Sequence, residues 1–265
     1  MISDPGRKVA FPTATALVMA NMIGTGVFVS LGYQLLDLKS GLVILLLWVM
    51  GGVIALCGAL SYGELVARLP RSGGEYHFLS RIFHPALGLM AGIVSLTAGF
   101  AAPVALSAMA FGEYFSRALE FGSSTHWAVL VVLVVGGVHA CGTAVGAPFQ
   151  IFFTLLKVTL IALLIGAAFL IGKAGDAGFG LTSQVVQEVF SRPFAISLIW
   201  VMYAYSGWNA AVYIASEVRQ PEQTLPRALV AGTLLVMGIY VLLNLAFLLA
   251  APIEALAGKA EVGLV

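Results

Sequence analysis

The stretch Ile23-Gly24-Thr25-Gly26-Val27 decides how this chain of 265 residues is interpreted. It lies within an apolar segment, Val9 to Leu36, that is long enough to cross the roughly 30 Å hydrocarbon core of a bilayer as a helix. A glycine inside a helix costs about 1 kcal/mol of helix stability, so two glycines around a small hydroxyl favour a break. Close packing against another helix is the alternative reason for small residues at this place.

The composition of the whole chain excludes a water-soluble protein. Hydrophobic residues make up 60% of it and charged residues 9%, whereas a soluble domain carries about 25% charged residues. Intrinsic disorder and nucleic-acid binding are excluded because the chain is apolar and its formal net charge is +1. A disulfide-stapled module is excluded because the two cysteines, Cys57 and Cys141, both lie in apolar runs. We therefore expect a protein that resides in the lipid bilayer and has no nucleic-acid partner.

Seven apolar segments are long enough to cross a bilayer, which predicts an all-α polytopic membrane protein. They are Val9 to Leu36, Gly41 to Ala67, Ala86 to Phe115, Trp127 to Ala147, Phe149 to Ile171, Phe194 to Ser216 and Ala228 to Ala251. Pro103 lies near the middle of the third segment and predicts a kink there. With the N-terminus in the cytoplasm, the cytoplasmic side holds seven basic residues and the other side five. Because basic loops stay in the cytoplasm, we expect this orientation in the inner (cytoplasmic) membrane.

A second interrupted run, Tyr203-Ala204-Tyr205-Ser206-Gly207-Trp208-Asn209, lies in the sixth segment. Interrupted segments at matching positions of two halves indicate the binding site of a secondary transporter with inverted repeats. The two runs are five segments apart, which predicts a first five-helix repeat at residues 9–171 and the first two helices of a second repeat at 194–251. The remaining predicted parts are a cytoplasmic N-terminus at 1–8, an extracytoplasmic loop at 172–193 and an extracytoplasmic tail at 252–265.

Four motifs follow one another along the chain. They are Gly24-Thr25-Gly26-Val27-Phe28, Pro70-Arg71-Ser72-Gly73-Gly74-Glu75-Tyr76, the run Tyr203 to Asn209 followed by Glu217, and Pro221 to Arg227. In this order they resemble the amino acid–polyamine–organocation superfamily, and within it most of all the bacterial relatives of the L-type amino acid transporters. The resemblance implies a LeuT-like inverted-repeat fold with discontinuous first and sixth helices, and secondary active transport by alternating access. Transport would be sodium-independent exchange or proton-coupled symport. Family members have more spans than the seven found here, so we expect either a fragment or a natural short form that does not transport alone.

The first break offers groups for the carboxylate of an amino acid. A helix that begins inside the membrane presents free N–H groups and a positive dipole end, which favour an anion. The resemblance implies that the carboxylate binds the backbone amides of Thr25, Gly26 and Val27, next to Gly24.

The second break offers groups for the amino group and side chain of the substrate. The resemblance implies that carbonyls of Tyr203, Ala204 and Ser206 bind the amino group, and that Tyr203 stands at the place of the family's aromatic gate. The substrate side chain is then expected near Tyr203 and Asn209. This run contains no Asp or Glu, which argues against cationic substrates and favours neutral L-amino acids. Packing for Tyr203 and an interhelical hydrogen bond for Asn209 are the alternatives.

Lys157 is a charge deep inside the fifth segment. Ionisable groups inside membranes are costly and mark functional sites, whereas a lysine that extends its amine toward the interface is the alternative. The resemblance implies that Lys157 occupies the place where sodium-coupled relatives bind an ion, against the unwound first helix, and that Tyr240 belongs to the same network. We therefore assign both residues to coupling and gating, expect no metal or cofactor, and leave proton coupling open.

An intramembrane enzyme is the main alternative class of protein. The chain has no HExxH motif and no pair of intramembrane aspartates, and the run Ala59-Leu60-Ser61-Tyr62-Gly63 lacks the first glycine of a nucleophile elbow. We therefore expect no enzymatic activity. A truncated paralogue that does not transport, acting as a structural or regulatory helical bundle, is the remaining alternative.

Overall fold

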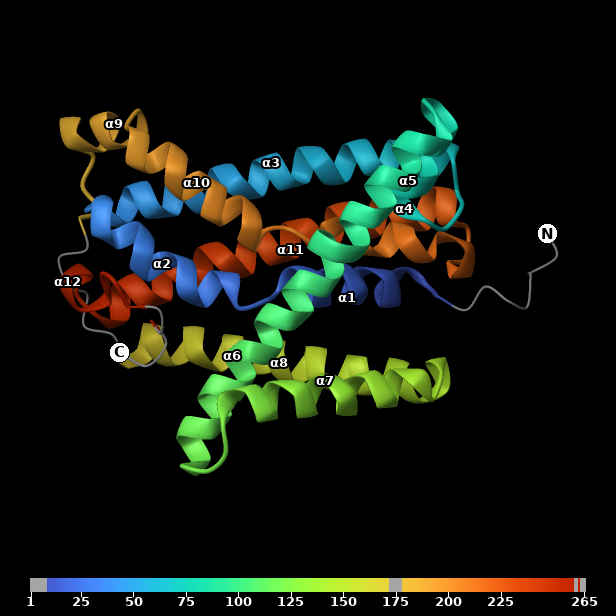
Figure 1. The fold of residues 1–265 in the computed structure, drawn as a ribbon. Helices are drawn as coiled ribbons and strands as arrows, with labels where there is room; N and C mark the ends of the chain where they lie inside the picture. Colours follow the sequence, from blue (N-terminus) through green and yellow to red (C-terminus); the bar gives the residue numbers. More distant parts are fainter. Residues whose placement is uncertain (1–8, 172–177, 260–261, 263–265) are drawn as a thin grey trace. The chain divides into compact units, whose positions relative to one another are not determined.

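The computed structural model describes residues 9–171, 178–259 and 262, which are almost entirely helical (Figure 1). Within this described part, β-pairing is limited to one parallel bridge between Val9 and Val218. The chain forms two compact units, one of Met1–Ser72 with Lys157–Val265 and one of Gly73–Leu156. Helix α8 (Thr143–Ile171) begins in the second unit and ends in the first.

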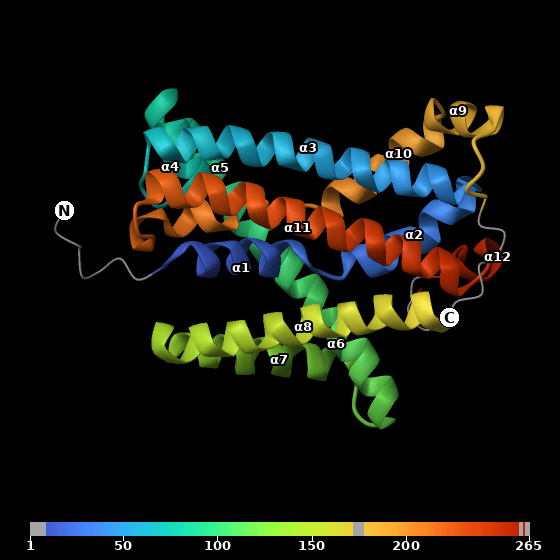
Figure 2. The same ribbon diagram turned by 180° about the vertical axis from the view of Figure 1, so that it is seen from behind.

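The first unit is built around two long apolar helices that lie side by side, α3 (Gly41–Arg68) and α11 (Pro221–Ala250) (Figure 2). Glycines bring its helices close together: a Cβ at Gly52 of α3 would lie 2.5 Å from Met237, and a Cβ at Gly232 of α11 would lie 2.6 Å from Val18. The other helices of this unit are α1 (Phe11–Met22), α2 (Gly26–Asp37), α9 (Ser183–Val189), α10 (Arg192–Ala204), the 3₁₀ helix η2 (Trp208–Glu217) and α12 (Ile253–Leu256). Small residues at these contacts are typical of helix packing in membranes.

Three aromatic side chains occupy the centre of the first unit. Trp48, Tyr205 and Tyr240 are fully buried, and their ring centroids lie 5.0–5.9 Å apart. The indole Nε1 of Trp48 donates to the Oε1 atom of Gln34, at 3.2 Å. This aromatic cluster therefore joins α3, α11 and the turn that follows α10, and Gln34 connects it to α2.

The second unit contains α4 (Gly74–Ile82), α5 (Pro85–Val94), the π-helical η1 (Ser95–Ala101), α6 (Ala102–Leu119) and α7 (Ser124–Ala140). Helices α5, η1 and α6 form one continuous apolar helix, Pro85–Leu119. Pro103 has no N–H to donate, and its ring clashes with the preceding turn of an α-helix. The wider π turn directly before Pro103 accommodates both effects, and Ala102 N–H donates to the carbonyl of Thr97. The structure has a π turn directly before Pro103, and the kink predicted there stays a prediction.

Four single helices are long and apolar enough to cross a membrane: Gly41–Arg68, Pro85–Leu119, Pro148–Leu170 and Pro221–Ala250. Two bent pairs add up to two more spans, Phe11–Met22 with Gly26–Asp37, bent by 41°, and Ser183–Val189 with Arg192–Glu217, bent by 61°. The remaining predicted span corresponds to α7, which has 17 residues. By length and composition the described residues thus hold four to six spans, as expected of an all-helical membrane protein. The count of seven and the inverted repeat stay predictions.

Some of the predicted parts fall wholly or partly outside the described residues. The N-terminus at 1–8 lies outside them, as do residues 172–177 of the predicted loop at 172–193. The rest of that loop contains α9, and the predicted tail at 252–265 contains α12.

Candidate functional site

The first helix break lies where the sequence predicts it. Helix α1 ends at Met22 and α2 begins at Gly26, so the chain between them is not helical. The Thr25 carbonyl accepts hydrogen bonds from the amides of Phe28 and Val29, at 3.1 and 3.3 Å. The amides of Gly26 and Val27 come before these, where an α-helix offers no acceptor of its own. They form the positive end of α2, as the predicted carboxylate site requires.

Gly24 and Thr25 differ in their surroundings. A Cβ at Gly24 would lie more than 4 Å from the atoms of any other described segment, so this backbone borders open space. Thr25 is half-buried, and Val27 is fully buried. At Gly24, backbone atoms rather than a side chain therefore border the open space.

The second break separates α10, which ends at Ala204, from η2, which begins at Trp208. Gly207 has φ +99°, a left-handed conformation that side chains disfavour. The amide and the hydroxyl of Ser206 both donate to the carbonyl of Tyr203, at 3.1 and 2.7 Å. A carbonyl oxygen has two lone pairs, so the Tyr203 carbonyl is fully engaged in this state. The Ala204 carbonyl accepts from the hydroxyl of Tyr240, at 3.1 Å.

The two breaks pack directly against each other. A Cβ at Gly26 would lie 3.2 Å from both the Cα and the Cβ of Ala204, and 3.6 Å from the Cδ1 of Tyr203. A Cβ at Gly207 would lie 2.7 Å from the carbonyl oxygen of Asn21. Because Gly26 and Gly207 have no side chain, the backbone of the facing segment can approach each of them closely.

The hydroxyl of Tyr240 connects the two breaks. This fully buried oxygen lies 2.6 Å from the carbonyl oxygen of Met22 and 3.1 Å from that of Ala204. Its single proton is shared between the last carbonyl of α1 and the last carbonyl of α10. The resemblance implied a place for Tyr240 near the unwound first helix, and its hydroxyl lies there.

The side chain of Lys157 points at the first break. Its Nζ atom donates to the carbonyl of Ile23 at 2.5 Å and to that of Ala20 at 3.4 Å. The side chain is half-buried, and the ammonium lies at the C-terminal, negative end of α1.

Two predicted residues lie at the rim of the second break. Tyr203 is 44% exposed, and its ring borders Gly26. Asn209 is half-buried in the first turn of η2. The structure brings Tyr203 next to the first break.

The model for amino acid permeases matches residues 9–265. The chain belongs to the amino acid permease family. It is 27% identical to the serine/threonine exchanger SteT of Bacillus subtilis, over 91% of this chain and 55% of the relative. It is 30% identical to the mouse b(0,+)-type amino acid transporter 1, over 96% of this chain and 54% of the relative. It is 29% identical to the mouse large neutral amino acids transporter small subunit 2, over 96% and 50%.

This permease chain spans about half the length of the curated relatives it matches. The relatives are transporters and exchangers rather than enzymes, which agrees with the absence of enzyme motifs from the sequence. Among the described residues, no group of three or more His, Cys, Asp or Glu is placed to hold a metal ion.

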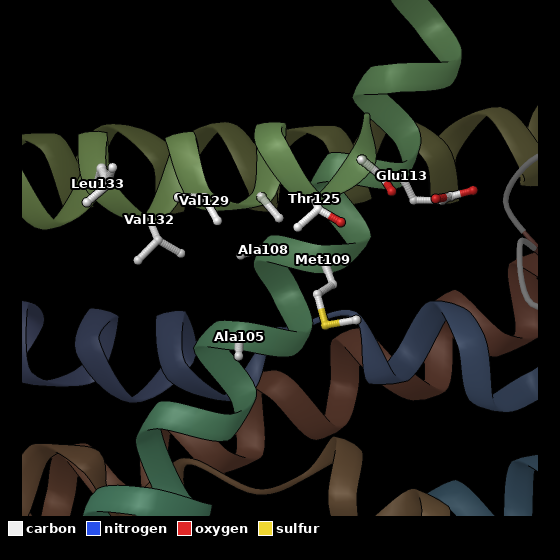
Figure 3. A pocket seen from close by; sticks show the side chains of 10 residues that line it. Ala105, Ala108, Met109, Glu113, Thr125, Val129, Val132 and Leu133 are labelled. Atoms are coloured by element: carbon white, nitrogen blue, oxygen red, sulfur yellow. The ribbon is translucent and has the colours of Figure 1, made fainter. Parts of the chain in front are cut away.

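The permease chain also has a cavity of about 410 Å³ between α6 and α7 of its second unit (Figure 3). Ala105, Met109, Val129 and Leu133 line it, with Glu113 at one end. Its lining is mostly apolar and includes none of the predicted site residues. The candidate site of this permease is therefore the pair of helix breaks in the first unit.

Sequence reasoning missed one residue at the second break of the permease. Its proposed role for the Ser206 carbonyl stays a prediction, and it did not include the hydrogen bond that the Ser206 hydroxyl donates to the Tyr203 carbonyl. It assigned no role to Tyr205, which is fully buried in the core of the unit. The one signal for Tyr205 in the sequence was its position, since it is an aromatic residue within the interrupted run where the chain has to turn.

Proposed function

We propose that this permease carries out secondary active transport of neutral L-amino acids across the cytoplasmic membrane, with its N-terminus in the cytoplasm. The pairing of the two breaks supports the proposal, because Gly26 at the start of α2 packs directly against Ala204 at the end of α10, so backbone amides and carbonyls lie within one small region. The named activities of the relatives support it, since serine, threonine and large neutral amino acids are all neutral.

The carboxylate of the substrate would bind the amides at the start of α2. Gly26 and Val27 offer N–H groups at the positive end of a helix, and the space beside Gly24 is open. Hydrogen bonds to a charged acceptor contribute about 1.5–3 kcal/mol each, so two such bonds supply much of the free energy needed for micromolar to millimolar binding.

The amino group of the substrate would bind the carbonyls of Ala204 and Ser206. The Tyr203 carbonyl joins them only if the hydroxyl of Ser206 turns away, because that hydroxyl and the Ser206 amide occupy both of its lone pairs. Rotation of one exposed serine side chain is fast and inexpensive. Ser206 would therefore release the Tyr203 carbonyl when substrate arrives.

The charges around the breaks favour neutral substrates over cationic ones. Residues 203–209 contain no carboxylate, and Lys157 already places an ammonium on Ile23. A second cation in the same low-dielectric region would be repelled. The same ammonium would take the place of a coupling metal ion at the end of α1, so we propose transport that does not depend on sodium, by exchange or by proton symport.

The test is uptake of labelled alanine, serine and leucine by the purified protein in proteoliposomes, with empty liposomes as control. The chain alone is expected to bind amino acids without transporting them. Saturable uptake is expected of a full-length permease that carries this chain, and neutral amino acids should inhibit that uptake whereas arginine and glutamate should not. Replacing sodium by choline should leave the rate unchanged. Preloading with unlabelled substrate accelerates exchange, whereas an inward proton gradient accelerates symport.

The proposal would be overturned by the absence of both saturable uptake and measurable amino acid binding. That result would favour the structural or regulatory bundle. Inhibition by arginine equal to that by leucine would overturn the neutral specificity alone.

A further inference from the structure

Tyr205 lies inside the second break but points into the core of the first unit. It follows Ala204 directly, in the turn between α10 and η2, and it is fully buried. Its hydroxyl donates to the carbonyl of Trp48 in α3 at 3.0 Å. The turn of the second break is therefore attached to a long, continuous helix.

The hydroxyl fits into a notch that two glycines form on α3. A Cβ at Gly52 would lie 3.0 Å from the Tyr205 hydroxyl, and a Cβ at Gly51 would lie 3.3 Å from the ring. In an α-helix the carbonyl of Trp48 also accepts the amide of residue 52. The phenol therefore uses the second lone pair of this carbonyl. A larger residue at Gly52 would crowd this hydroxyl and also the side chain of Met237, which a Cβ there would meet at 2.5 Å.

The same turn is attached at a second point through its neighbour. The carbonyl of Ala204 contacts the hydroxyl of Tyr240, and the rings of Tyr205 and Tyr240 have centroids 5.0 Å apart. Trp48 packs on both rings, at 5.9 and 5.4 Å. Two adjacent residues of the break are thus held by buried groups of α3 and α11.

We propose that Tyr205 is a positioning residue of the amino acid site. By binding the notch on α3, it fixes the turn and so the direction of the Tyr203 and Ala204 carbonyls. This inference rests on the proposed function, because these carbonyls matter only if an amino group binds them. The side chain itself does not touch the substrate. Tyr205 therefore acts on the part of the substrate that all α-amino acids share.

The test compares Tyr205→Phe, which removes only the hydroxyl, with Gly52→Ala, which crowds both the hydroxyl and Met237 from α3. Equilibrium binding of labelled alanine, serine and leucine is measured on the purified protein in nanodiscs, with thermal unfolding in the absence of substrate. We expect both variants to weaken binding by about three- to tenfold, which corresponds to the loss of one buried hydrogen bond. The factor should be the same for all three amino acids. Tyr114→Phe, which removes a hydroxyl from an exposed side chain of α6, should bind as the wild type does.

Wild-type affinity in Tyr205→Phe would overturn the positioning role, and so would a loss of thermal stability without a loss of affinity. A loss that differs strongly among alanine, serine and leucine would also overturn it, because it would place Tyr205 at the substrate side chain. A wild-type protein that binds no amino acid would instead overturn the proposed function.

Discussion

The ammonium of Lys157 lies 2.5 Å from the carbonyl oxygen of Ile23, one residue before Gly24. A helix C-terminus carries partial negative charge and carbonyls without intrahelical donors. The ammonium satisfies two such carbonyls of α1, those of Ile23 and Ala20. Because the carbonyl of Ile23 accepts from Lys157, the chain does not need to continue the helix through Gly24. The lysine thus stabilises the interrupted form of the first span.

In a full-length permease that carries this chain, Lys157→Met should impair uptake of labelled alanine by about tenfold or more while the protein still folds. Methionine keeps the length of the side chain but leaves the Ile23 carbonyl without its donor, at a cost of about 1–3 kcal/mol. Uptake rates in proteoliposomes with equal amounts of reconstituted protein measure the effect.

Lys39→Met is the matched control for this substitution. The Nζ atom of Lys39 also donates to carbonyls at a helix C-terminus, those of Leu35 and Leu36 in α2, but it lies away from the break. We expect near-wild-type uptake from Lys39→Met. Near-wild-type uptake from Lys157→Met as well would rule out a role for the charge.

Gly26→Leu should lower the affinity for amino acids by at least about tenfold, which is 1.4 kcal/mol. The new Cβ would meet Ala204 at 3.2 Å, and the rest of the side chain would separate the two breaks or fill the space of the carboxylate. Gly238→Leu in α11 is the control, because nothing lies within 4 Å of a Cβ at Gly238. Binding isotherms of the two variants provide the comparison. Equal amino acid affinity of the two variants would show that Gly26 is not part of the amino acid site.

The place of the first break was predictable because it follows from local chemistry. Gly24 and Gly26 weaken a helix wherever they occur in one, and the structure ends α1 at Met22 and starts α2 at Gly26. The place of Lys157 relative to this break came from the family resemblance, because no periodicity relates two residues more than 130 positions apart.

Two other contacts between distant segments could not be predicted from the local sequence. Gly207 packs on the carbonyl of Asn21, and Tyr205 occupies a notch at Gly51 and Gly52, because the fold brings these segments together. Pro103 illustrates the same limit within a single helix. A proline fixes where the hydrogen-bond ladder is interrupted, but it does not specify whether the helix bends or forms the π turn observed at Ser95–Ala101.

Gly207→Ala should destabilise the protein by about 1–3 kcal/mol. Alanine would have to adopt φ +99°, and its Cβ would lie 2.7 Å from the carbonyl oxygen of Asn21. Gly166→Ala in α8 is the control, since a Cβ there has open space. Thermal unfolding in one detergent should show a lower midpoint for Gly207→Ala alone. Equal midpoints for the two variants would contradict the close contact between α1 and the second break.

Tyr240→Phe and Lys157→Met should act non-additively on substrate affinity. Tyr240 binds the carbonyl of Met22 and Lys157 binds that of Ile23, so the two side chains hold adjacent carbonyls at the end of α1. Once one is lost, the end of α1 is free to rearrange, and losing the other costs less. Binding measured on the wild type, both single variants and the double variant gives the coupling free energy, which we expect at about 0.5–3 kcal/mol.

The control pair is Tyr33→Phe with Lys157→Met. Its effects on affinity should be additive, because Tyr33 stacks on Trp200, away from the end of α1. Additive losses for Tyr240→Phe and Lys157→Met would mean that the two side chains hold the first break independently.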